Sequence, residues 1–154
     1  MLLAIKNPRP DGGTFVELSG TAEGQDLVKL IGFVEGPLVI NCSGITRINS
    51  VGIRRWLIYF NNANEPRNNV KLEEVSLALV EQLNMFQNFM GQAEITSVMA
   101  PYLCNNCKNK YQEKVCIFKL DVSKIAKSPS ICPKCSGQGK FDDDPDLYFR
   151  FLKK

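Results

Sequence analysis

Four of the six cysteines in this 154-residue chain occur as two close pairs. Two residues separate Cys104 from Cys107, two separate Cys132 from Cys135, and 24 residues lie between the pairs. Each such pair closes a tight turn that points two sulfur atoms at one place, and two pairs at this separation are typical of a zinc ribbon. We therefore expect these four residues to hold one Zn²⁺ ion.

An ion bound by four thiolates has no free coordination position, so it would stabilise the fold and would not activate water. The C-terminal segment needs such support, because a small domain with few large aliphatic side chains buries too little apolar surface. Two other interpretations of the same sulfurs stay open, an iron site and a redox dithiol pair. The remaining cysteines, Cys42 and Cys116, are expected to be small buried apolar residues.

The chain contains no histidine. Histidine is the usual side chain for proton transfer near neutral pH, so Ser-His-Asp and Cys-His nucleophilic schemes are excluded. With a closed metal site and no histidine, the chain is expected not to be an enzyme.

Composition and hydropathy indicate a globular cytoplasmic protein. Hydrophobic residues make up 44% of the chain and charged residues 23%. No apolar stretch approaches the ~20 residues that a transmembrane helix needs, and the N-terminus reaches Lys6 too soon for a signal peptide. Paired cysteines in a compartment that keeps thiols reduced favour a metal site over a disulfide.

Basic residues are concentrated in the C-terminal segment. Residues 101–154 contain 11 basic and 6 acidic side chains, whereas residues 1–100 contain 8 and 10. This excess leaves nucleic-acid binding open as an alternative function. The side chains expected to take part are the cations Lys108, Lys110, Lys114, Lys119, Lys124, Lys127 and Lys134, with Tyr111 and Phe118 for base stacking.

Residues 1–100 are expected to form an α/β domain with helices on a mixed, mostly parallel sheet. Strands are predicted at 1–5, 14–18, 38–42, 70–75 and 95–99, and the first two should form a hairpin. Ser43 and Gly44 are expected to end the third strand. Helices are predicted at 24–33, from residue 49 with Ile53, Trp56, Leu57 and Phe60 on one face, and from Ser76 to a stop at Gly91.

The domain boundary is expected near Pro101, with a small β-rich ribbon over 101–154. An outgoing strand at 110–120 and a turn and return over 122–131 should bring the second cysteine pair beside the first. Asp144 and Pro145 have the residue types of a helix N-cap and first helical residue. The resulting short C-terminal helix is expected to cover the ribbon with Leu147, Phe151 and Leu152.

Residues 38–56, LVINCSGITRINSVGIRRW, resemble the central signature of STAS domains, the family named after sulfate transporters and anti-sigma-factor antagonists. That signature is a buried strand, a Ser-Gly turn, an apolar link and Asp-Ser-Ser-Gly at a helix start. The matching residues are Asn49, Ser50, Val51 and Gly52, so two of the four depart from the pattern. The resemblance implies a bacterial signalling module that binds a protein partner, such as a serine kinase that acts as an anti-sigma factor.

The resemblance also implies roles for residues at this helix start. Ser50 has two compatible roles, as a helix N-cap and as a phosphate acceptor. Gly52 is expected to allow close backbone packing. Arg54 and Arg55 are expected on the outer face of the helix, either as part of a docking surface with Asn49 and Gly52 or as a solvated surface.

Overall fold

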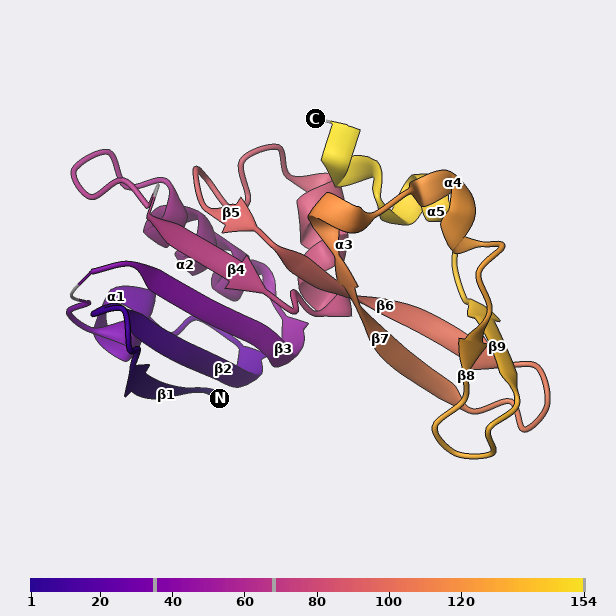
Figure 1. The fold of residues 1–154 in the computed structure, drawn as a ribbon. Coiled ribbons are helices and arrows are strands. Elements are labelled where there is room, and N and C mark those ends of the chain that lie inside the picture. The colour runs from indigo at the N-terminus through magenta and orange to yellow at the C-terminus, as the bar shows by residue number, and fades with distance from the viewer. Residues whose placement is uncertain (35, 68, 154) are drawn as a thin grey trace.

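The computed structural model describes residues 1–34, 36–67 and 69–153 and contains two sheets (Figure 1). The first sheet has five strands and the second has four. The coarse prediction, a mixed α/β fold followed by a small β-rich part, is therefore confirmed. Within the described residues, no helix is long and apolar enough to span a membrane.

The first sheet is mixed and has its strands in chain order. It consists of β1 (Leu2–Pro8), β2 (Thr14–Ala22), β3 (Leu38–Ile48), β4 (Val70–Glu73) and β5 (Glu94–Ile95). The first two strands are antiparallel and all later pairs are parallel. The predicted hairpin and the mostly parallel sheet are both confirmed.

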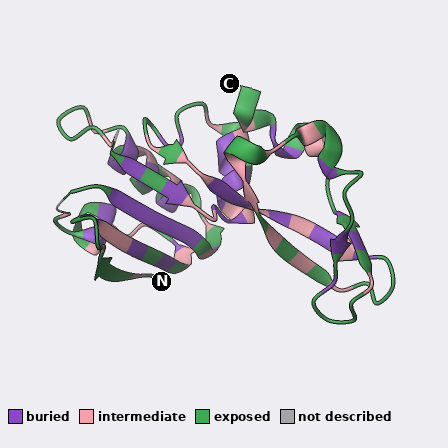
Figure 2. Cartoon of the chain, viewed as in Figure 1, coloured by how far each residue is buried: buried purple, intermediate pink, exposed green. Residues whose placement is uncertain are grey.

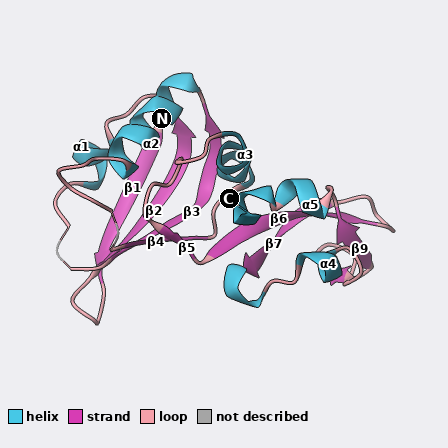
Figure 3. Ribbon diagram, turned by 90° about the horizontal axis from the view of Figure 1, so that it is seen from above, coloured by secondary structure: helices cyan, strands magenta, loops and turns pink. Residues whose placement is uncertain are grey.

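Three helices follow strands of this sheet: α1 (Leu27–Ile31), α2 (Ser50–Phe60) and α3 (Leu77–Met85). Helices α1 and α2 lie behind the sheet in Figure 1 and beyond it in Figure 3, so they cover the same face. The predicted apolar face of α2 is confirmed, because Trp56 and Phe60 are buried. Helix α1 is shorter than expected because Asp26 caps its start and Gly32, at φ 72°, ends it.

Strand β3 does not end at Ser43 and Gly44, which corrects the prediction. It continues to Ile48 beside β2, which itself continues to Ala22. A Cβ atom on Gly44 would lie 2.7 Å from the Cβ of Ser19. The glycine therefore allows β2 and β3 to approach closely, and it does not form a turn.

Helix α3 ends at Met85, before the predicted stop at Gly91. The N–H of Phe86 makes the last helical hydrogen bond, to the carbonyl of Gln82, and the chain then leaves the helix. Phe89 and Met90 are still buried, and the ring of Phe89 stacks on Trp56 with centroids 5.8 Å apart. These two apolar side chains therefore pack in the core from the turn that follows α3.

The second sheet is antiparallel, with strand order β7-β6-β9-β8. Its strands are β6 (Ser97–Cys104), β7 (Lys110–Cys116), β8 (Ser130–Ile131) and β9 (Gln138–Phe141). The predicted outgoing strand at 110–120 is present as β7, which ends at Cys116 and pairs with β6. A short 3₁₀ turn (Ile117–Lys119) and the helix α4 (Val122–Ile125) occupy much of the predicted strand and return.

Strand β6 passes through the expected boundary at Pro101 without a break, and the two sheets share one hydrophobic core. Val98 in β6 forms a single parallel bridge to Val75, which belongs to the predicted strand at 70–75 but lies beyond the end of β4 at Glu73. In Figure 2 the buried residues continue from the first sheet through α3 into β6.

The C-terminal segment packs across both parts of the chain. It contains α5 (Pro145–Tyr148), capped by Asp144 as predicted, and a 3₁₀ turn (Arg150–Lys153). The amide of Asn84 in α3 donates to the carbonyl of Tyr148 at 2.9 Å and accepts the N–H of Phe151 at 2.8 Å.

The side chains that cover the core from this segment differ from those predicted. Tyr148 and Phe149 are buried, whereas Leu147 and Leu152 are exposed and Phe151 is half-buried. The expected cover by Leu147 and Leu152 is therefore wrong, because Tyr148 at the end of α5 and the following Phe149 point inward instead.

Candidate metal centre

Each cysteine pair lies in the turn beyond the end of a strand. Cys104 is the last residue of β6, and its N–H donates to the carbonyl of Asn109 across the first turn at 2.9 Å. Cys132 follows β8, and its N–H donates to the carbonyl of Gly137 across the second turn at 2.8 Å. Antiparallel pairing of β6 with β9 places Cys104 opposite Gly139, so the two turns lie side by side.

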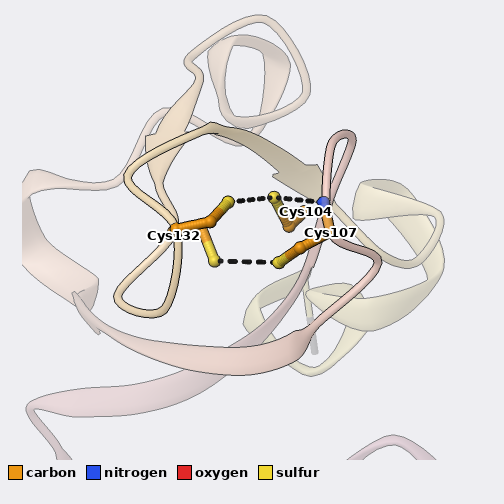
Figure 4. A group of neighbouring side chains, drawn as sticks. Cys104, Cys107 and Cys132 are labelled. Carbon is orange, nitrogen blue, oxygen red and sulfur yellow. Dashed lines mark hydrogen bonds between the residues drawn. The ribbon is translucent and has the colours of Figure 1, made fainter.

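The four sulfur atoms converge on one point. All of them lie within 4.8 Å of one another. The Sγ atoms of Cys104 and Cys135 are 3.5 Å apart, and those of Cys107 and Cys132 are 3.7 Å apart (Figure 4). A tetrahedral ion with bonds of ~2.3 Å to sulfur requires sulfur–sulfur distances of ~3.8 Å, whereas a disulfide requires ~2.05 Å. The four cysteines can therefore hold a metal ion.

Backbone N–H groups in both turns donate to the sulfurs. Cys104 accepts from the N–H groups of Asn106 and Cys107, both at 3.4 Å. The N–H of Lys134 donates to Cys132 at 3.4 Å, and that of Gly137 donates to Cys135 at 3.3 Å. Hydrogen bonds to a sulfur favour its thiolate form, which is the form that binds metals.

Two asparagine side chains add donors from the first turn to sulfurs of the second. The Nδ2 of Asn106 lies 3.7 Å from the Sγ of Cys135, and that of Asn109 lies 3.9 Å from the Sγ of Cys132. The turns are also alike in backbone, because Lys108 and Ser136 each follow the second cysteine of a pair and have φ near 60°. The two turns therefore have the same backbone conformation after their second cysteine.

The environment of Cys135 favours its ionised form most clearly. The pKa of Cys135 is lowered to about 6. The main cause is the hydrogen bond from the N–H of Gly137, and the second is the contact with Cys104. A side chain at Gly137 would crowd the cluster, because a Cβ there would lie 3.1 Å from the Sγ of Cys135. Cys104 and Cys132 are buried, whereas Cys107 and Cys135 are exposed, so the cluster faces solvent on one side.

The other two cysteines lie outside the cluster. Cys42 is completely buried in β3, as predicted, and burial raises the pKa of its thiol well above the usual range. Cys116 ends β7 and is only half-buried, so the expectation that it would be buried is wrong. The alternation of β7 explains this, because its even-numbered residues face outward.

At the start of α2 the N-cap is Asn49, which corrects the assignment of that role to Ser50. The Oδ1 of Asn49 accepts the N–H of Gly52 at 2.8 Å, and Ser50 is the first helical residue, exposed to solvent. Close packing at Gly52 is confirmed, because a Cβ there would lie 2.0 Å from the carbonyl oxygen of Ala22. Arg54 and Arg55 are exposed, as predicted.

The residues considered for nucleic-acid binding separate onto two faces of β7. Lys110 and Lys114 are exposed on one face. Tyr111 is half-buried on the other face, where its hydroxyl donates to the Oγ of Ser130 at 2.9 Å and its ring stacks on Tyr102. Tyr111 is therefore not free to stack on bases, whereas Phe118 is 79% exposed.

Sequence reasoning missed Lys140, which is exposed in β9. A strand over these residues would place Lys140 on the exposed face of the sheet, because side chains alternate along a strand and Gly139 and Phe141 are buried.

No protein-family model, curated protein or solved structure matches this chain. The assignment of a function therefore depends on the residues and geometry described above.

Proposed function

We propose that this chain is a non-enzymatic regulatory module in which a STAS-like domain binds a protein partner and a zinc ribbon stabilises the C-terminal part. The four-sulfur cluster of Cys104, Cys107, Cys132 and Cys135 is the observation that carries the zinc-ribbon part of the proposal. It accounts for four of the six cysteines and for the donors around them.

Zinc in a structural role fits this cluster best. Four thiolates complete the tetrahedral shell that zinc adopts in such sites, and they leave no position for a substrate. The distances of 3.5 and 3.7 Å between sulfurs are close to those required. Iron could occupy the same four sulfurs, and elemental analysis of the purified protein separates the two metals.

The proposed partner surface is the exposed start of α2. Ser50, Arg54 and Arg55 are all exposed there, and Val51 is 50% exposed although it is aliphatic. The strand order of the first sheet, with one antiparallel hairpin followed by parallel strands, supports a STAS-like arrangement. By that resemblance the partner is a protein regulator such as a serine kinase, and the compartment is the cytoplasm.

Ser50 is proposed as the residue that switches this surface. Its hydroxyl is exposed at a helix N-terminus, where the partial positive charge of the helix dipole tolerates a phosphate. Phosphorylation would add about −1.5 to −2 charges beside Arg54 and Arg55. A partner that docks on these two arginines would then be displaced.

The test is affinity capture from the source cell with three forms of the zinc-loaded protein. The wild type and a control with Lys29→Glu and Lys71→Glu should retain the same partner, and a variant with Arg54→Glu and Arg55→Glu should lose it. Lys29 and Lys71 are also exposed, so both variants change the net charge equally. Equal capture by all three forms would contradict this docking surface.

The switch is tested separately by calorimetry with the partner so identified. Ser50→Asp should weaken binding at least tenfold, whereas Ser50→Ala should leave it unchanged. Intact mass of protein from the source cell should show a phosphorylated species. Equal affinities and a single unmodified mass would leave the surface as a constitutive docking site and contradict the switch.

A further inference from the structure

The outer face of the second sheet carries the outward side chains of its four strands, and at Pro101 it borders a pocket lined by Leu77 of α3 and Leu147 of α5. Along β6 and β7, buried or half-buried residues alternate with more exposed ones, and Figure 2 shows this alternation on β7. The strand pairing places the outward residues of all four strands on one face. We call this set the outer face; it consists of Met99, Pro101, Leu103, Lys110, Gln112, Lys114, Ile131, Gln138 and Lys140.

The outer face is positively charged. Its three lysines, Lys110, Lys114 and Lys140, are exposed, and among the described residues none of them forms an ion pair. None of the face residues is acidic. Glu113 in β7 points to the opposite face, where it accepts a hydrogen bond from Ser130. Three unpaired cations without a carboxylate among them fit a partner with regularly spaced negative charges.

The three lysines lie on β7 and β9, with β6 between these two strands. Lys110 and Lys114 are four residues apart on β7, so their Cα atoms are ~14 Å apart at the usual strand rise. Lys110 and Lys140 lie on either side of Leu103 in β6, because both pair with it. Two strand spacings separate them by ~10 Å. A chain of phosphates can reach all three lysines while it crosses the sheet.

Apolar side chains lie between and beside the lysines. Leu103, Met99 and Pro101 are half-buried in β6, and Ile131 in the edge strand β8 is 74% exposed. A duplex keeps its bases stacked inside and would make no use of these side chains. Unpaired bases can lie on such a surface while their phosphates meet the lysines.

We propose that the outer face binds single-stranded nucleic acid, with Lys110, Lys114 and Lys140 on phosphates and the bases against Leu103 and Ile131. This site lies on the second sheet and is independent of the docking surface at the start of α2. It retains two of the lysines that the sequence indicated, adds Lys140, and excludes Tyr111.

Fluorescence anisotropy of a labelled 20-nucleotide thymidine strand tests the proposal on the full, zinc-loaded chain. Three phosphate contacts to a single strand predict a slope of about −2 for log affinity against log salt, or a loss of about 20-fold between 50 and 200 mM salt. Each single change, Lys110→Gln, Lys114→Gln or Lys140→Gln, should reduce the slope by about 0.7.

Two controls separate the outer face from general charge effects. The triple change Lys29→Gln, Lys71→Gln and Lys124→Gln alters the net charge as much as loss of the three face lysines, and it should leave binding unchanged. Asp142 follows Lys140 by two residues, is exposed, and borders the face beside Pro101. Asp142→Asn should therefore strengthen binding.

Several results would overturn the proposal. These are no binding at 20 mM salt, equal losses in the face and control triple variants, or equal affinity for a duplex of the same length. Equal binding of a poly-glutamate peptide would assign the face to an acidic protein instead. Circular dichroism and zinc content of each variant keep these outcomes distinct from a failure of the metal site.

Discussion

The Sγ atom of Cys104 lies 3.5 Å from that of Cys135, although the two are 31 positions apart in the chain. The intervening segment leaves through β7, forms α4, and returns through β8, and β9 follows the second turn. Pairing of Cys104 with Gly139 then brings the second turn back to the first. A metal ion bound by the four cysteines would therefore hold the ends of this long excursion together.

Replacement of Cys104 or Cys135 by serine should abolish metal binding and release the second turn. Because β9 has only four residues, its pairing with β6 depends on this closure. Amide hydrogen exchange in β9 should accelerate by a factor on the order of 100, while β2 to β4 remain protected as a separate unit of local stability. Exchange measured by mass spectrometry, with metal content, checks the prediction.

The matched control is Cys116→Ser, which removes a half-buried thiol outside the cluster. It should keep the metal and the protection of β9. Equal acceleration in the control, or full protection in Cys135→Ser, would show that the cluster does not hold the second turn.

Asn49→Ala should destabilise the protein by about 1 kcal/mol, because it removes the side-chain cap of α2. The same change at Ser50 should cost less than ~0.5 kcal/mol, since this residue is exposed and makes no cap bond. Urea denaturation of both variants measures the difference in free energy of unfolding. A larger loss of unfolding free energy in Ser50→Ala than in Asn49→Ala would show that Ser50 is the N-cap.

Gly52→Ala should cost about 1–3 kcal/mol, because the added methyl group forces the start of α2 away from β2. The methyl carbon would lie 2.0 Å from the carbonyl oxygen of Ala22, and a backbone atom cannot move aside as a flexible side chain can. Urea denaturation measures this loss, with Ser50→Ala as the control. A loss below ~0.5 kcal/mol would mean that the helix start is free to shift.

Cys42 should resist alkylation in the native, metal-loaded protein. It is completely buried, and burial raises the pKa of its thiol, so the reactive thiolate is scarce at pH 8. Iodoacetamide should label Cys116 and leave Cys42 unmodified, as read by peptide mass spectrometry.

The control for this labelling is guanidinium with a chelator, where all six cysteines should react. Labelling of Cys42 and Cys116 at equal rates in the native protein would contradict the packing of β3.

The sequence was sufficient to predict features that local pattern determines. The spacing of Cys104, Cys107, Cys132 and Cys135 identified the cluster, and helical periodicity identified the buried face of α2. Turn residues between apolar runs located four strands of the first sheet, whereas the predicted strand at 95–99 covers the end of β5 and the start of β6. In each case the structure is determined by residues that are close together in the sequence.

Features that depend on distant partners were missed or misplaced. Ser43 and Gly44 have the residue types of a turn, but pairing with β2 keeps them in a strand. Phe89 and Met90 continue an apolar pattern after α3 has ended. Strand β9 is too short to predict alone, and its pairing is with the distant strand β6.

X-ray absorption at the zinc edge, combined with elemental analysis of the purified chain, tests the central claim most directly. The account predicts one zinc ion per chain with four sulfur neighbours at ~2.3 Å and no nitrogen or oxygen neighbour. Folded protein that contains no metal, contains iron instead, or binds zinc through fewer than four sulfurs would contradict it.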